Sequence, residues 1–141
     1  MRKHEPTNGS TDTATVIATP PPFERGDKLT RDEFMRRWEQ HPEIKFAELI
    51  GGIVYMPSPL SREHGKSDNR VCGWLWVYHA HTPGTEAGNN TTTLMLADAP
   101  QPDGYLRILP EYGGRSGDEG IYVSGAPELL TEVSLSGKMR K

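Results

Sequence analysis

Apolar residues near position 30 recur at the spacing of one helical face. Phe34 and Trp38 are four positions apart, so both side chains point to the same side of a helix. Thr30 stands three residues before Glu33, which is the spacing of a capping box at a helix start. The pattern therefore predicts a helix over residues 31–40, which ends before a proline.

The next apolar residues form two short runs that are typical of paired strands. Residues 46–50 and 53–56 flank the dipeptide Gly51-Gly52, and a two-glycine turn between such runs predicts a β-hairpin. Apolar residues then return to helical spacing, which predicts a second helix over residues 61–81. Further strands are expected at residues 91–96, 105–109, 121–123 and 129–135, and loops at residues 82–90 and 110–120. This order predicts an α/β fold in which a mixed β-sheet is flanked by helices.

Composition separates a first segment from the rest of the 141-residue chain. Residues 1–27 are rich in Thr, Pro, Asn and Ser and contain one short apolar cluster, so we expect a disordered tail followed by one domain over residues 28–141. No run of apolar residues is long enough for a secretory signal or a membrane span. Because Cys72 is the single cysteine, the sequence indicates a soluble cytoplasmic protein without an internal disulfide.

Three carboxylates stand inside or against apolar strand patterns: Glu48, Asp103 and Glu132. Each of them alone fits the exposed face of an alternating strand. Together, on neighbouring strands, they would supply the oxygen ligands that Mg²⁺ prefers. Without a cation they would repel one another, so that one carboxyl would tend to keep its proton.

The formal net charge of −3 argues against a protein that binds nucleic acid through its overall charge. Any nucleic-acid role must therefore come from a local site. Trp74, Trp76 and Tyr78 offer one candidate, a base-stacking surface. On a helix these side chains point in different directions, which favours a mixture of packing and exposure instead.

Four segments, "FAELIGGIVYMPSP", "SREHG", "QPDGYLRI" and "GAPELLTEVS", resemble successive motifs of the Uma-type restriction endonuclease family. That family belongs to the PD-(D/E)XK nuclease-like superfamily, and the resemblance runs over residues 29–136. It implies a restriction-endonuclease-like core and a Mg²⁺- or Mn²⁺-dependent endonuclease that hydrolyses phosphodiester bonds in DNA. Such nucleases often dimerise to cut two strands, so a homodimer is compatible with the resemblance.

The resemblance also implies roles for individual residues. Asp103 matches the aspartate of the "PD" element and Glu132 the acidic residue of the following strand, and both would be metal ligands. Glu48 matches an accessory acid near the metal, and His64, in the "EHG" element, would face the same cleft and contact substrate. For Arg107, in the strand that follows Asp103, two alternatives are open: contact with a phosphate, or an ion pair with a surface acid.

The end of the chain departs from the superfamily pattern. The superfamily's lysine should follow Glu132 by two positions, but Ser134 stands there, and Lys138 is a weak candidate to replace it. The last strand and helix of the fold are expected to be missing, so the domain would be incomplete at its C-terminus. The alternative function is therefore a truncated, catalytically inactive remnant that serves as a nucleic-acid-binding or interaction module.

Overall fold

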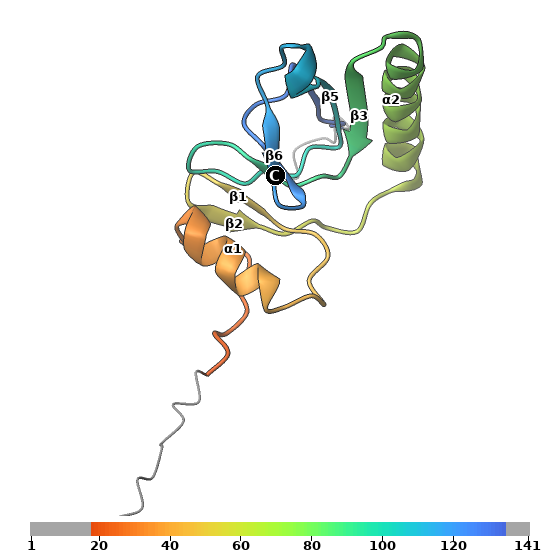
Figure 1. Ribbon diagram of the computed structural model, residues 1–141. Helices are drawn as coiled ribbons and strands as arrows, with labels where there is room; N and C mark the ends of the chain where they lie inside the picture. The colour runs from red at the N-terminus through yellow and green to blue at the C-terminus, as the bar shows by residue number, and fades with distance from the viewer. Residues whose placement is uncertain (1–17, 135–141) are drawn as a thin grey trace, which may run out of the picture.

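The computed structural model describes residues 18–134 and combines helices with short strands (Figure 1). In chain order the elements are α1 (Arg31–Glu39), β1 (Glu48–Ile50), β2 (Ile53–Tyr55), α2 (Arg62–His81), β3 (Thr85–Asn89), β4 (Thr93–Leu94), β5 (Gly104–Ile108), the 3₁₀ helix η1 (Pro110–Tyr112), β6 (Gly117–Glu119), β7 (Tyr122–Ser124) and β8 (Leu129–Thr131). The expected mixed α/β class is confirmed.

Both predicted helices form, and each has the cap that its sequence encodes. The Thr30 hydroxyl accepts a hydrogen bond from the backbone N–H of Glu33 at 3.2 Å, which starts α1. The Ser61 hydroxyl accepts one from the backbone N–H of His64 at 3.1 Å, which starts α2. The predicted hairpin also forms, because Gly51 and Gly52 supply the positive φ angles that its turn requires.

The strands form three small sheets rather than the single mixed sheet that the sequence predicts. β1 and β2 pair as a hairpin, β3, β5 and β8 form an antiparallel sheet, and β4, β7 and β6 form a mixed sheet. β4 has two residues and pairs in parallel with β7, so it does not extend the antiparallel ladder around β5. The hairpin is joined to the later chain by an isolated bridge between Leu49 and Ala99 and by hydrogen bonds to the carboxylates of Asp98 and Glu48. A restriction-endonuclease-like core stays a prediction.

Two strands lie where the sequence predicts loops. β3 occupies the segment "TEAGN", which has no apolar alternation, yet it pairs with β5 along its whole length. Its Gly88 leaves room for the ring of Tyr105, since a Cβ at that glycine would lie 2.4 Å from a ring carbon. β6 lies in the glycine-rich segment expected as a loop and pairs with β7. The loop predictions are therefore wrong at both places, because backbone pairing outweighs weak strand propensity.

The main apolar core lies between α1 and the β1–β2 hairpin. It consists of Phe23, Phe34, Ala47, Leu49, Val54, Leu94 and Ala99, all buried. Phe23 stacks on Phe34 with ring centroids 4.7 Å apart, and the N–H of Gly26 donates to the carbonyl of Val54 at 2.8 Å. The packed chain thus begins before residue 28, where the domain was predicted to start. A single phenylalanine beside prolines carries no periodic signal that would have revealed this.

α2 lies apart from this core and packs beside β3 and β5 (Figure 1). Leu75 is the buried residue of α2, and its side chain approaches Gly104 at the start of β5. The described helices include none with both the length and the apolar character needed to cross a membrane. α2 and the sheet that contains β3 and β5 position one end of the candidate site.

Candidate functional site

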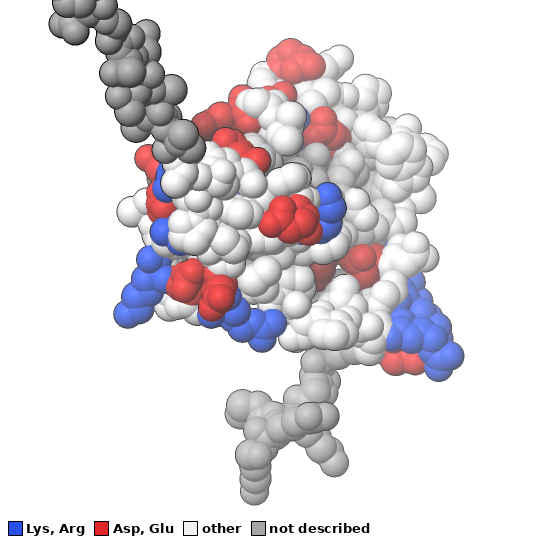
Figure 2. Space-filling view, turned by 90° about the horizontal axis from the view of Figure 1, so that it is seen from below, with Lys and Arg blue, Asp and Glu red and all other residues white. Residues whose placement is uncertain are grey.

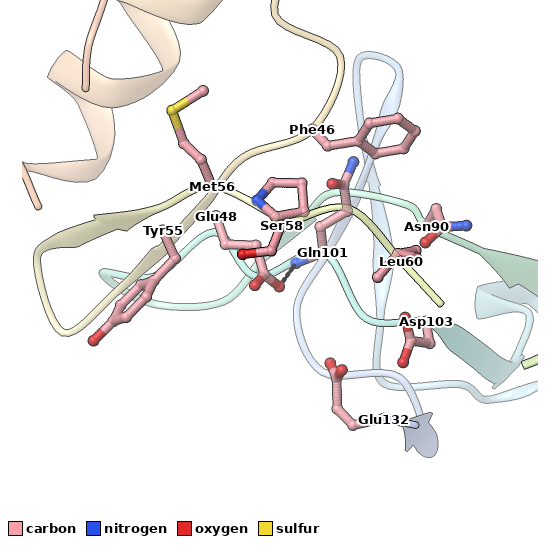
Figure 3. Close-up of a pocket in the computed structure, with 11 residues that line it drawn as sticks. Phe46, Glu48, Tyr55, Met56, Ser58, Leu60, Asn90, Gln101, Asp103 and Glu132 are labelled. Atoms are coloured by element: carbon pink, nitrogen blue, oxygen red, sulfur yellow. Dashed lines mark hydrogen bonds between the residues drawn. The ribbon is translucent and has the colours of Figure 1, made fainter. Parts of the chain in front are cut away.

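The structure brings the three predicted carboxylates to one pocket of about 520 Å³. Glu48 comes from β1, Asp103 from the residue before β5, and Glu132 from the residue after β8. Figure 3 shows the carboxyl groups of Asp103 and Glu132 facing one another, with Glu48 farther along the same hollow. The remaining lining residues are Phe46, Tyr55, Met56, Pro57, Ser58, Leu60, Asn90 and Gln101.

Strand pairing places Asp103 opposite Glu132. In the antiparallel β5–β8 register Gly104 pairs with Thr131, so the next positions outward are Asp103 and Glu132. One carboxylate oxygen of Asp103, Oδ2, accepts a hydrogen bond from the backbone N–H of Val133 at 2.6 Å. This bond fixes the Asp103 side chain to the strand that carries Glu132.

Glu48 is held by a different part of the backbone. Its Oε1 accepts a hydrogen bond from the backbone N–H of Gln101 at 2.6 Å (Figure 3). The neighbouring Leu49 exchanges two backbone hydrogen bonds with Ala99, which ties β1 to the segment before Asp103. Sequence reasoning missed Gln101 and also Asn90, another lining residue, whose backbone N–H donates to the carbonyl of Asp103 at 3.3 Å. The only sequence signal for Gln101 is its place in "QPD".

The electrostatic environment acts most strongly on Glu132. Burial, together with the negative charges of Asp103 and Glu48, raises the pKa of its carboxyl to about 7, and His64 opposes this rise. Glu132 as a whole residue is nevertheless exposed, so water screens part of this effect. A cation in the pocket would favour the ionised form and relieve the repulsion between the carboxylates.

His64 does not line this pocket, but it lies beside one of the lining residues, Asp103. Its Nε2 is 3.8 Å from Oδ2 of Asp103, and its side chain is 15% exposed. The other ring nitrogen, Nδ1, is buried and has no hydrogen-bond partner within residues 18–134. The first turn of α2 thus adds an ionisable nitrogen to the carboxylate group.

Arg107 does not line the pocket. It is 3% exposed, and its guanidinium donates to Glu86 at 2.9 Å, to Asp118 at 2.7 Å and to the carbonyl of Gly117 at 2.9 Å. Of the two alternatives that the sequence left open, the ion pair is the one observed, although the arginine itself is buried. The substrate-binding role does not fit, because the donors of Arg107 are engaged away from the cleft.

The fit to a metal ion rests on two carboxylates rather than three. Among residues 18–134, no three His, Cys, Asp or Glu side chains converge closely enough to form a ready metal centre. Mg²⁺ commonly takes one or two carboxylates and completes its shell with water and phosphate oxygens. Asp103 and Glu132, which face one another, meet that requirement, and Glu48 lies farther away. Lys138 lies outside the described residues.

Comparison with protein-family models and with curated proteins found no match to this chain. The resemblance to the Uma-type nuclease family therefore rests on its quoted motifs alone. It stays a prediction, whereas the shared pocket of the three carboxylates is observed.

Proposed function

We propose that the protein is a Mg²⁺- or Mn²⁺-dependent endonuclease that hydrolyses phosphodiester bonds in DNA. The observation that carries this proposal is the facing pair of carboxylates from β5 and β8, Asp103 and Glu132, in a pocket that raises the pKa of Glu132. Two such groups form a site that gains from binding a divalent cation.

Asp103 and Glu132 would hold the metal, with Glu48 as an accessory acid. The cation supplies Lewis acidity and lowers the pKa of a bound water. The protein contributes orientation: the bond from Val133 fixes Asp103, and the bond from Gln101 fixes Glu48. His64, 3.8 Å from Asp103, would contact substrate at the mouth of the pocket.

The second candidate is a module that binds nucleic acid or a protein without cleaving DNA. One observation favours it: the described lining of the pocket contains no lysine or arginine. A cationic group that stabilises the charge developing on the phosphate is a usual part of phosphodiester hydrolysis. The two candidates share the fold and differ in catalysis, so a cleavage assay separates them.

The test is cleavage of plasmid and of single-stranded DNA by the full chain with Mg²⁺ or Mn²⁺. Asp103→Asn keeps an acceptor for Val133 but removes the charge, so we expect cleavage to fall at least about a hundredfold. Glu111→Gln, on an exposed residue of η1, is the matched control and should cleave normally. Equal activity of wild type and Asp103→Asn would reject the nuclease. Absent cleavage by wild type would favour the non-catalytic module.

A further inference from the structure

One side of α2 packs on the sheet, and the opposite side is uncovered by the described chain. On the packed side, Leu75 is buried and Nδ1 of His79 lies 2.9 Å from the carbonyl of Thr85. On the other side, Trp74 is 62% exposed, Val77 57% and Tyr78 49%. Figure 1 shows α2 at the margin of the molecule, with β3 on one side only.

The first half of this outward side is cationic. Arg62, Lys66 and Arg70 recur every four residues and are exposed. Figure 2 shows Lys and Arg side chains gathered at the edge of the molecule that carries α2. Glu63 lies 3.4 Å from Arg62 and 3.7 Å from Lys66, but such exposed pairs are weak and leave the lysine and arginine groups accessible. Arg70 makes no ion pair within residues 18–134.

The second half of the same side is aromatic. Trp74 and Tyr78 continue the four-residue interval after Arg70, so the cationic row runs directly into an aromatic row. From Lys66 to Tyr78 the row extends over about 18 Å, the length of a few nucleotides. The mixture of packing and exposure that the sequence favoured is observed, because these three side chains are only partly exposed and the ring of Trp76 lies against His79.

Cations followed by exposed aromatic rings match the chemistry of single-stranded nucleic acid. Phosphates pair with lysine and arginine, and unpaired bases stack on aromatic side chains. A second copy of the chain fits this surface less well. A twofold contact would bury the same cation-rich surface on both partners, and Glu63 is the only acid on this side of α2.

We propose that the outward face of α2, defined by Lys66, Arg70, Trp74 and Tyr78, binds single-stranded nucleic acid. The backbone phosphates lie along the two cations, bases stack on the two aromatic rings, and Arg62 adds a positive charge at the start of the helix. α2 begins beside the carboxylate pocket, because His64 in its first turn is 3.8 Å from Asp103. A nucleic-acid strand bound along this face would therefore lead to the pocket. That link to the pocket rests on the proposed nuclease function, whereas the binding does not.

The chain offers a matched control on the same helix. Trp76 is 60% exposed, almost as much as Trp74, but the two positions point about 160° apart around the helix. The ring of Trp76 lies against His79, with centroids 5.0 Å apart, outside the proposed face. Trp74→Ala and Trp76→Ala therefore remove the same kind of side chain, each from a different side of the helix.

The experiment measures the fluorescence anisotropy of a labelled oligothymidine of about 20 nucleotides with the full chain in EDTA, where cleavage plays no part. We expect Trp74→Ala to weaken binding about tenfold and Trp76→Ala to leave it unchanged. Arg70→Ala should lower the slope of log K against log salt by about 0.7. Because Arg70 is exposed, its replacement should leave the fold intact. Arg70→Ala therefore still tests the proposal if circular dichroism shows that Trp74→Ala is misfolded.

Other results would overturn the proposal. Wild type that fails to bind the oligonucleotide, or equal losses in Trp74→Ala and Trp76→Ala, would reject the binding face. A wild-type dimer in sedimentation that Trp74→Ala dissociates, without any oligonucleotide binding, would make the face a self-association surface. Binding without any cleavage would keep this proposal and reject the nuclease.

Discussion

Two regions of the molecule are stabilised by different kinds of interaction. In the hairpin half, formed by α1, β1 and β2, the buried side chains are apolar and three aromatic rings, Phe23, Phe34 and Trp38, contact one another. In the pocket half, formed by α2, β3, β5 and β8, the buried groups include the charged Arg107. The facing pair Asp103 and Glu132 thus belongs to the half with fewer buried apolar side chains, and Glu48 joins the pocket from the hairpin half.

This difference teaches how a short chain can hold carboxylates close together. Apolar packing in the hairpin half supplies stability that does not depend on pH or metal. The pocket half can then accept repulsion between Asp103 and Glu132 because the apolar core of the hairpin half contributes stability that offsets it. Three substitutions test this division: one in the buried interior of each half and one in the pocket itself.

The largest effect is expected in the hairpin half. Phe34 is fully buried and contacts both Phe23 and Trp38, so Phe34→Ala should lower the free energy of unfolding by about 3–5 kcal/mol. Urea denaturation measures the change. Phe46→Ala, on a half-exposed phenylalanine, is the control and should cost clearly less. Equal costs would mean that the aromatic cluster does not dominate the stability of this half.

A smaller loss is expected from the charged group of the pocket half. Arg107→Met removes the partner of Glu86 and Asp118, and both carboxylates are exposed enough to regain water. We therefore expect the free energy of unfolding to fall by about 1–3 kcal/mol. Arg115→Met, on an exposed arginine of the same region, should change it by less than about 0.5 kcal/mol. A neutral Arg107→Met would show that the ion pairs add nothing to this half.

The smallest expected change in the free energy of unfolding is an increase, and it comes from replacement of Glu132. The folded chain raises the pKa of Glu132 from its ordinary value of 4.5 to about 7, so the stability associated with its proton is lost as pH rises between these values. Glu132→Gln should therefore raise the free energy of unfolding by about 1–2 kcal/mol near pH 8 without metal, after allowance for screening by solvent.

The same variant has an internal control. Near pH 4, where the carboxyl is protonated in both folded and unfolded chains, the difference between Glu132→Gln and wild type should vanish. Denaturation across this pH range measures it. A constant difference at every pH would mean that the substitution acts through packing, and the electrostatic account of the pocket would fail.

Much of the fold is predictable where one local signal is enough. The cap at Thr30 marks the start of α1, and the Gly51-Gly52 turn marks where β1 ends and β2 begins, because these interactions lie within a few residues. β3 escaped prediction because its pairing depends on β5, whose residues come about twenty positions later. The division into three sheets likewise depends on long-range register, which no local pattern encodes.

The candidate site shows the same limit. Glu48, Asp103 and Glu132 could be selected from sequence because carboxylates inside apolar runs are unusual. The hydrogen bonds that orient them could not, since the N–H groups of Gln101 and Val133 are identified only by strand register. For Arg107, the sequence showed a charge in a strand but not the two acids that reach it from β3 and β6.

The bond from Val133 to Asp103 has a consequence for local motion. The residue after Glu132 is held to the sheet by a side chain of the pocket rather than by a backbone carbonyl. Replacement of Asp103 by alanine would remove the acceptor, so the Val133 amide would exchange its hydrogen with solvent faster. The exchange rate of this one amide therefore reports whether the Asp103 side chain still holds this segment, and NMR can follow it without any substrate.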